Sequence, residues 1–221
     1  MRILAVVATT QERDALLRNV SAEPVQVGPY RAATTGAGTL LVGGIGPAAA
    51  AAATATALTL SSYDVVLSLG VCGGFAGAAD LGDVVVATDL VAADLGADSP
   101  SGFLSLGELG WAQESHPVDP ELVKAAATRL GEVVTGPVLT VSTVTGTDAR
   151  AGMLAERHGA VAEAMEGWGV LEAARPHGLA VLEVRTVSNR VGRRDTATWD
   201  FPRAFASLAH VGAALLEDPW P

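Results

Sequence analysis

Short apolar runs alternate along the chain with stretches that have the spacing of helices. Residues 2–8, 64–70 and 179–187 are almost continuously apolar, which is typical of strands buried on both faces of a sheet. Residues 47–60 begin with proline and are rich in alanine, which predicts a helix packed against that sheet. The alternation predicts an α/β fold, organised as one domain over residues 1–221.

Shorter elements complete this pattern. Further strands are predicted at residues 24–27, 30–35, 39–43, 81–93, 133–143 and 160–165, and further helices at 11–20, 118–130, 149–158, 167–177 and 202–216. We expect Asp148 to cap the helix at 149–158. The Gly- and Ser-rich residues 94–117 are expected to form an ordered loop, and residues 190–201 a mobile loop over the site.

Two polar pairs stand where predicted strands end. Met165 and Glu166 follow one strand, and Ser188 and Asn189 follow the next strand along the chain. Because ligands of open α/β sheets bind beyond the carboxyl ends of the strands, both pairs are expected at one site. A carboxylate and an amide placed there could hold a pair of sugar hydroxyls and a planar heterocycle.

A further carboxylate, Glu12, lies after the first predicted strand. Thr9 and Thr10 are expected to cap the helix that follows, which places Glu12 in its first turn, where the positive end of a helix favours a carboxylate. Two interpretations remain open for Glu12. It is either a capping-box residue on the surface or a functional carboxylate above the end of the strand.

Two glycine-rich segments also follow strands. Gly73 and Gly74 come after the strand at 64–70, and consecutive glycines let a flat ligand lie against the backbone. Gly44 and Gly46 precede the helix at 47–60, where such a loop either binds an anion or allows close packing of helix on sheet. Neither segment is a Walker A loop, and no dinucleotide fingerprint follows the first strand, which argues against a dinucleotide-binding oxidoreductase.

Composition narrows the classes of partner. The chain has 14 Lys and Arg against 24 Asp and Glu, a net charge of −10, and no basic run, so we expect neither nucleic acid nor an anionic membrane as partner. Its one cysteine, Cys72, excludes an intrachain disulfide. Cys72 and the four histidines lack the spacing of metal ligands, so no metal or cofactor is predicted. No signal-peptide or membrane-span pattern is visible, and we expect a cytoplasmic protein.

Together, Glu12, the G-x-x-G-G segment at 70–74, Met165-Glu166 and Ser188-Asn189 resemble the nucleoside phosphorylase/nucleosidase superfamily. The resemblance covers nearly the whole chain and is to the branch related to uridine phosphorylase and methylthioadenosine/S-adenosylhomocysteine nucleosidase. It implies a three-layer α/β/α fold with a mixed central sheet, a small nucleoside substrate and a homo-oligomer. Phe103 and Trp111, apolar residues of a loop, agree with an oligomer.

The resemblance also implies residue roles. Glu12 would activate water, Met165 and Glu166 would bind ribose, and Ser188 and Asn189 would hold the N7 edge of a purine. The backbone near Gly73, Val144 and Thr145 would pack on the nucleoside and hold its base. We therefore predict Glu12, Glu166 and Asn189 as catalytic residues.

Two departures from the family pattern indicate the reaction and the substrate. Phosphorylases carry an arginine just before the glycine turn, but Ser68 and Leu69 stand here, so water is the expected nucleophile. Asn189 replaces the aspartate of the adenine-releasing nucleosidases, and an amide that donates and accepts suits a 6-oxopurine such as hypoxanthine better. Arg190 and Arg193, with Arg194, would suit a carboxylate on the 5′ side of the substrate.

The sequence thus predicts a hydrolytic purine nucleosidase that releases hypoxanthine. Methylthioadenosine/S-adenosylhomocysteine nucleosidase and purine nucleoside phosphorylase are alternatives within the superfamily. A non-catalytic nucleoside-binding protein is the alternative from another class, although both Glu12 and Glu166 are present.

Overall fold

A mixed sheet of ten strands forms the centre of the fold in the computed structural model, which describes residues 1–220. Only residue 221, the last of the predicted domain, lies outside this range. The strands are β1 (Ile3–Val7), β2 (Ala22–Val27), β3 (Tyr30–Thr35), β4 (Gly38–Val42), β5 (Val65–Gly74), β6 (Val84–Ala92), β9 (Ser115–Pro117), β10 (Val134–Thr140), β11 (Ala162–Ala164) and β12 (Ala180–Arg190).

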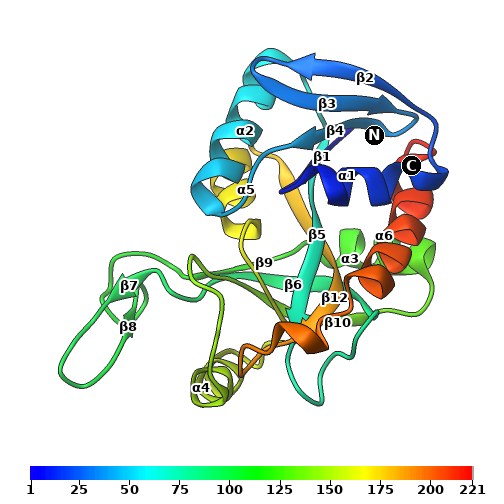
Figure 1. Ribbon diagram of the computed structural model, residues 1–221. Helices are drawn as coiled ribbons and strands as arrows, with labels where there is room; N and C mark the ends of the chain where they lie inside the picture. Colours follow the sequence, from blue (N-terminus) through cyan, green and yellow to red (C-terminus); the bar gives the residue numbers. More distant parts are fainter. Residues whose placement is uncertain (221) are drawn as a thin grey trace.

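Helices cover both faces of this sheet (Figure 1). They are α1 (Thr10–Leu16), α2 (Pro47–Leu60), α3 (Pro120–Leu130), α4 (Asp148–His158), α5 (Gly167–Ala174) and α6 (Phe201–Leu216). Helices α2 and α5 pack together on one face, and α6 packs with α1 and α3 on the other. The predicted three-layer α/β/α fold with a mixed sheet is therefore confirmed.

The strand order is β11-β10-β6-β12-β5-β1-β4-β3-β2, and β9 joins the edge of β6. Strand β11 also pairs antiparallel with β5, so that β5, β12, β6, β10 and β11 form a closed ring of strands. Closure of this ring sets Glu163 of β11 opposite Gly73 of β5. Segments far apart in the sequence thereby meet at one end of the sheet.

The sequence placed α2 correctly, and several other boundaries differ. Strand β5 does not turn at its glycines but continues through Gly73 and Gly74, which pair with Asn189 and Arg190. Strand β12 likewise passes through Ser188 and Asn189, with a bulge there, because β5 offers partners along its whole length. Helix α4 is capped by the side chain of Thr147, whereas Asp148 is its first residue.

The run at 179–187, which we treated as apolar, contains two charged residues. Glu183 and Arg185 lie within β12 and are fully buried. They are two residues apart, so they share one face of the strand. This error matters for the site, because these two side chains form part of it.

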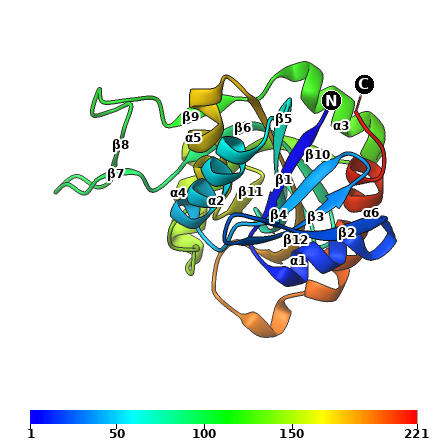
Figure 2. The ribbon, with the colours of Figure 1, turned by 90° about the horizontal axis from the view of Figure 1, so that it is seen from above.

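A short hairpin, β7 (Gly96–Ala97) and β8 (Leu104–Ser105), lies inside the predicted loop at 94–117. It projects from the body of the molecule in both ribbon views (Figures 1 and 2). The loop of this hairpin contacts α4, where the Arg157 guanidinium lies 5.4 Å from the Phe103 ring centroid. Across residues 1–220, every helix is too short or too polar to traverse a lipid bilayer.

Candidate active site

A hollow of about 410 Å³ opens where β5, β11 and β12 meet the start of α1. Seven predicted site residues from separate parts of the chain line it: Glu12, Gly73, Val144, Met165, Glu166, Ser188 and Asn189. A smaller hollow of about 60 Å³ adjoins it and shares Gly73, Val144 and Asn189. The remaining predicted residues, Thr145, Arg190 and Arg193, line this smaller hollow.

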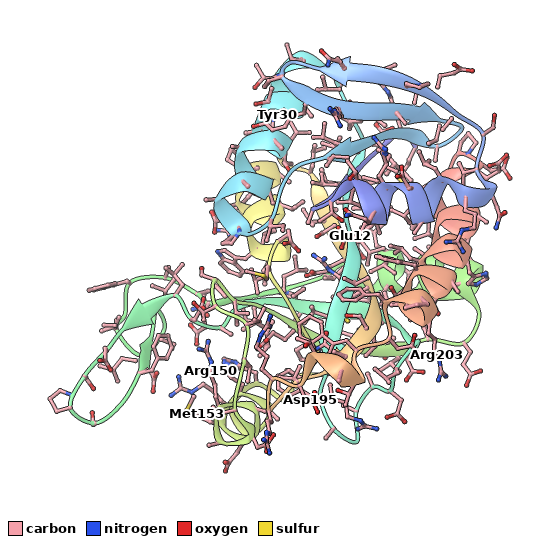
Figure 3. The ribbon with its side chains drawn as sticks, in the orientation of Figure 1. Glu12, Tyr30, Arg150, Met153, Asp195 and Arg203 are labelled. Atoms are coloured by element: carbon pink, nitrogen blue, oxygen red, sulfur yellow. The ribbon has the colours of Figure 1, made fainter. Side chains whose placement is uncertain are left out.

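Glu12 is both a helix cap and a buried carboxylate of the hollow. Its Oε2 accepts hydrogen bonds from the Thr9 N–H at 2.8 Å and the Thr9 hydroxyl at 2.9 Å, which with the Glu12 N–H completes a capping box. Its Oε1 accepts from the Val71 N–H of β5 at 3.0 Å. Figure 3 shows this side chain beneath α1 and beside β5. The interpretation as a capping residue on the surface is therefore wrong, because Glu12 is buried.

Burial raises the pKa of Glu12, and the Val71 N–H and the charge of Arg185 partly oppose that rise. A carboxyl group with a raised pKa holds a proton more strongly than an ordinary one. Such a group is a stronger base than an ordinary carboxylate.

Glu166 stands at the junction of β11 and α5 and is also buried. Its Oε1 accepts from the Gly46 N–H at 3.1 Å, and its Oε2 accepts from Arg185 Nη1 at 3.1 Å. The glycine loop before α2 thus holds a protein carboxylate. Gly46 has φ of +90°, a conformation that favours glycine.

The sequence reasoning missed Arg185, the cation at the centre of this region. Its guanidinium contacts Glu183 Oε1 at 2.8 Å, Glu166 Oε2 at 3.1 Å and the Ser68 hydroxyl at 2.9 Å. Burial alone would lower the pKa of Arg185, but the carboxyl groups of Glu183, Glu166 and Glu12 raise it above its ordinary value. A signal was present: charged residues at alternate positions of an apolar strand require buried partners.

Two glycines make room for this cluster. A Cβ on Gly70 would lie 2.5 Å from Glu12 Oε1 and 2.8 Å from Arg185 Nη1. A Cβ on Gly167 would collide with the Glu183 carboxylate. Burial raises the pKa of Glu183, and its Oε2 has no hydrogen-bond partner within residues 1–220.

The other end of the hollow carries the amide of Asn189. Its Oδ1 accepts from the Ser188 hydroxyl at 2.9 Å, and its Nδ2 donates to the Arg190 carbonyl at 3.1 Å. One hydrogen of Nδ2 and one lone pair of Oδ1 therefore remain for a ligand. Gly73 keeps this amide close to β5, since a Cβ there would lie 3.1 Å from Nδ2.

The segment after β10 borders the same end. Val144 is 40% exposed and lines both hollows. Thr145 is buried, and both its N–H and its hydroxyl donate to Glu163. Glu163 was not predicted from the sequence, although it lies next to the Met165-Glu166 pair and lines both hollows.

The three arginines after β12 differ in placement. Arg190 forms an exposed ion pair with Asp80 at 2.7 Å. The backbone N–H of Arg193 donates to Asp148 at 2.8 Å, which ties this loop to α4. Arg194 lines both hollows, and its guanidinium lies 4.9 Å from the centroid of the Trp199 ring.

Two features bear on other chemistries. Cys72 lines the hollow, but burial raises the pKa of its thiol to about 12, so it carries no thiolate at neutral pH. Within residues 1–220, no three His, Cys, Asp or Glu side chains gather in a way that could hold a metal ion.

Comparisons with known proteins identify the family of the chain. A family model described as the phosphorylase superfamily matches residues 2–218. A Streptomyces coelicolor protein named futalosine hydrolase is 48% identical over 224 residues, which cover 97% of this chain and 95% of that protein. A protein of the same name from Acidothermus cellulolyticus is 46% identical, over 96% of this chain and 89% of its own length.

A solved structure extends the comparison to the fold. The 5′-methylthioadenosine/S-adenosylhomocysteine nucleosidase from Neisseria meningitidis, in complex with methylthio-immucillin-A, matches with a TM-score of 0.82. The match covers 97% of this chain and 98% of that one at 21% identity. At this identity the likeness shows a shared fold and nothing finer.

Proposed function

The chain belongs to the phosphorylase superfamily, and on that premise we propose that it is a futalosine hydrolase. Such an enzyme cleaves the N-glycosidic bond of futalosine with water and releases hypoxanthine and dehypoxanthine futalosine, in the route to menaquinone. The observation that carries this proposal is the identity of 48% and 46% to two proteins of that name over nearly the whole chain. The enzyme class, a hydrolase of nucleoside N-glycosidic bonds, rests on the same likeness.

Hydrolysis of this bond makes three demands on the site. Water must lose a proton as it attacks the anomeric carbon, the positive charge that grows on the ribose must be stabilised, and the leaving base must be held. The proposal assigns these tasks to Glu12, Glu166 and Asn189 in that order.

Glu12 is the proposed general base. Its Oε2 accepts from Thr9, its Oε1 accepts only the Val71 N–H among residues 1–220, and Glu12 lines the hollow. The raised pKa of this carboxyl group supports the role, because a base is most effective when its pKa lies near the working pH.

Glu166 is the proposed ribose ligand and stabilises the charge that develops there. Its two oxygens are oriented by Gly46 and Arg185, so the carboxylate is fixed before substrate binds. Met165 beside it also lines the hollow and would pack against the sugar.

Asn189 is the proposed partner of the base. The free hydrogen of Nδ2 suits the O6 acceptor of hypoxanthine, and the free lone pair of Oδ1 suits a proton on N7. Adenine presents an amine where hypoxanthine presents O6. The amide therefore supports hypoxanthine as the released base. Adenine would be the base released by the alternative, a methylthioadenosine/S-adenosylhomocysteine nucleosidase.

Water is a better nucleophile here than phosphate. A phosphorylase would need excess positive charge near the sugar, and the guanidinium beside Glu166, that of Arg185, is shared by Glu12, Glu166 and Glu183. A phosphate dianion beside this cluster would meet three carboxyl groups and a guanidinium that they already share. Ser68 and Leu69 by themselves do not show that this region lacks an arginine, because Arg185 of β12 donates to the Ser68 hydroxyl. The argument against phosphate therefore rests on how Arg185 is paired.

Futalosine has a benzoate on its extended 5′ side, and that carboxylate would favour a guanidinium. Arg190 and Arg193 remain candidates for this contact, and Arg194 joins them because it borders the larger hollow. Ile45 and Phe201, both exposed and on the wall of this hollow, offer apolar surface to the aromatic ring.

Three further expectations stay part of the proposal. Trp111 is 71% exposed near the projecting hairpin, which supports a homo-oligomer in which a second copy covers it. We also propose one domain over residues 1–221 and a cytoplasmic location.

Product analysis tests the proposed function. Purified protein is incubated separately with futalosine, inosine and methylthioadenosine, with and without phosphate. The products are separated by chromatography and identified by mass spectrometry. We expect hypoxanthine from futalosine at a rate that phosphate does not change. Release of a ribose 1-phosphate would indicate a phosphorylase, and adenine formed as fast as hypoxanthine would indicate the alternative nucleosidase.

A further inference from the structure

Glu163 is a buried carboxylate without a counter-ion. Its side chain is on β11 and is 6% exposed, yet no ion pair within residues 1–220 includes it. Arg150 acts on Glu163 through its charge, but its guanidinium pairs with Asp94 at 3.7 Å. Burying a carboxylate is costly unless hydrogen bonds compensate it.

The hydrogen bonds that Glu163 makes leave part of its capacity unused. Its Oε1 accepts from the Thr145 N–H at 2.8 Å, and its Oε2 accepts from the Thr145 hydroxyl. An ionised carboxylate offers about four acceptor positions. Further donors can therefore reach Glu163 from the hollows that it lines.

Glu163 lies at the same end of the site as Asn189. Gly73 stands between them in the sheet: it pairs with Glu163 across β11 and β5, and with Asn189 across β12 and β5. Both side chains line both hollows, together with Val144. A planar base held by the Asn189 amide would thus have the Glu163 carboxylate along its edge.

We propose that Glu163 accepts a hydrogen bond from N1–H of the 6-oxopurine and, with Asn189, determines the choice of base. This inference rests on the proposed function and names a further specificity residue of the same site. Hypoxanthine in its lactam form carries a proton on N1, whereas N1 of adenine is an unprotonated acceptor. A carboxylate facing N1 therefore binds the first base and repels the second.

A positioning role is the competing explanation. Glu163 could act only through Thr145, by holding the 144–146 segment against the base. That role would treat both bases alike, because it does not involve the proton on N1. The ratio of affinities for hypoxanthine and adenine separates the two explanations.

The test is calorimetric binding of free hypoxanthine and free adenine to the full chain. We expect the wild type to favour hypoxanthine. Glu163→Gln should weaken hypoxanthine about 10- to 100-fold without weakening adenine, because a carboxamide can turn its donor towards N1 of adenine. The matched control is Thr145→Val, which removes one partner of the carboxylate and keeps its charge. It should move both affinities together and leave their ratio unchanged.

Equal losses for both bases in Glu163→Gln would overturn the inference in favour of positioning. If that variant does not fold, the wild type is compared on hypoxanthine and 1-methylhypoxanthine, which lacks the N1 proton. Equal binding of these two bases also overturns it. The proposed function is judged separately, by whether the wild type releases hypoxanthine from futalosine, so the two failures are distinguishable.

Discussion

The two ends of the hollow are built in different ways. At the nucleophile end, Glu12, Glu166, Glu183 and Arg185 are all buried, and their contacts join α1, β5, β12 and the start of α2. At the base end, the Asn189 side chain bonds, within residues 1–220, only to its sequence neighbours Ser188 and Arg190, and Val144 is 40% exposed.

This difference separates reaction from selectivity. The nucleophile end is held by long-range contacts between charges, so changes there are expected to affect rate or folding. The base end is held by local contacts on a strand end and two loops, so changes there are expected to alter which base is accepted. Glu163 is the exception, since it is a buried charge at the base end.

The strongest test of the nucleophile end is Glu12→Gln. Losing the base should lower kcat by about 100- to 10,000-fold, while a carboxamide of the same shape preserves binding. Single-turnover kinetics with futalosine and calorimetric binding of hypoxanthine measure the two effects. Near-normal turnover would show that Glu12 serves only as the cap of α1.

Arg185→Met tests whether the buried charges also hold the fold. Removing the cation leaves buried carboxyl groups without compensation, which should lower the free energy of unfolding by about 3–5 kcal/mol. Urea unfolding provides the measurement. The matched control is Arg190→Met, which breaks only an exposed pair with Asp80 and should cost less than about 1 kcal/mol.

A double variant tests whether the stability lost in Arg185→Met comes from the uncompensated charge of Glu183. Arg185→Met with Glu183→Leu removes both charges of the closer of the two Arg185 ion pairs and should recover part of the lost stability. No recovery would mean that Glu183 does not depend on Arg185 for its compensation.

Asn189→Asp tests the base end. An added carboxylate oxygen removes the donor for O6, so kcat/KM for futalosine should fall about 10- to 100-fold, and aminopurine nucleosides should become better substrates. The free energy of unfolding should change little, because the side chain of Asn189 bonds only to its sequence neighbours among residues 1–220. Parallel assays with futalosine and methylthioadenosine decide; an unchanged preference contradicts the role of the amide.

The smallest expected effect is a displaced acid limb of the pH–rate profile. Burial raises the pKa of Glu12 above 4.5, so kcat/KM should fall with decreasing pH already above that value as the base becomes protonated. Assays between about pH 4 and 8 locate the limb. Glu163 also has a raised pKa in the wild type, so Glu163→Gln serves as a control. The acid limb should persist in that variant.

Acid unfolding caused by protonation of Glu12 or Glu183 does not explain a loss of activity at low pH. Where burial raises the folded-state pKa of Glu12 or Glu183, the folded state binds the proton more tightly than the unfolded chain does. Their contribution to stability is then largest at low pH and declines as pH rises from 4.5 through the raised value. Acid therefore removes activity at Glu12 without destabilising the fold through it.

The sequence alone determined those helices, strands and caps whose signals lie within a few neighbouring residues. Proline at the first position and the following run of alanine fixed α2 at 47–60, and continuous apolar runs located the central strands β1 and β5. Thr9 with Glu12 gave the capping box, because both partners lie within one turn. The resemblance to the nucleosidases then placed Met165-Glu166 and Ser188-Asn189 near one site.

Only the tertiary structure decided which charges share that site. The pairing of β12 with β5 and β6 buried Arg185 with the carboxyl group of Glu183 on the same strand and with two others, Glu166 and Glu12, from distant places in the chain, and no local pattern records such distances. Closure of the sheet by β11 on β5 likewise set Glu163 beside Gly73 and Asn189. Whether a charge in a strand is a surface residue or part of a site depends on what packs against it, which is a property of the assembled sheet.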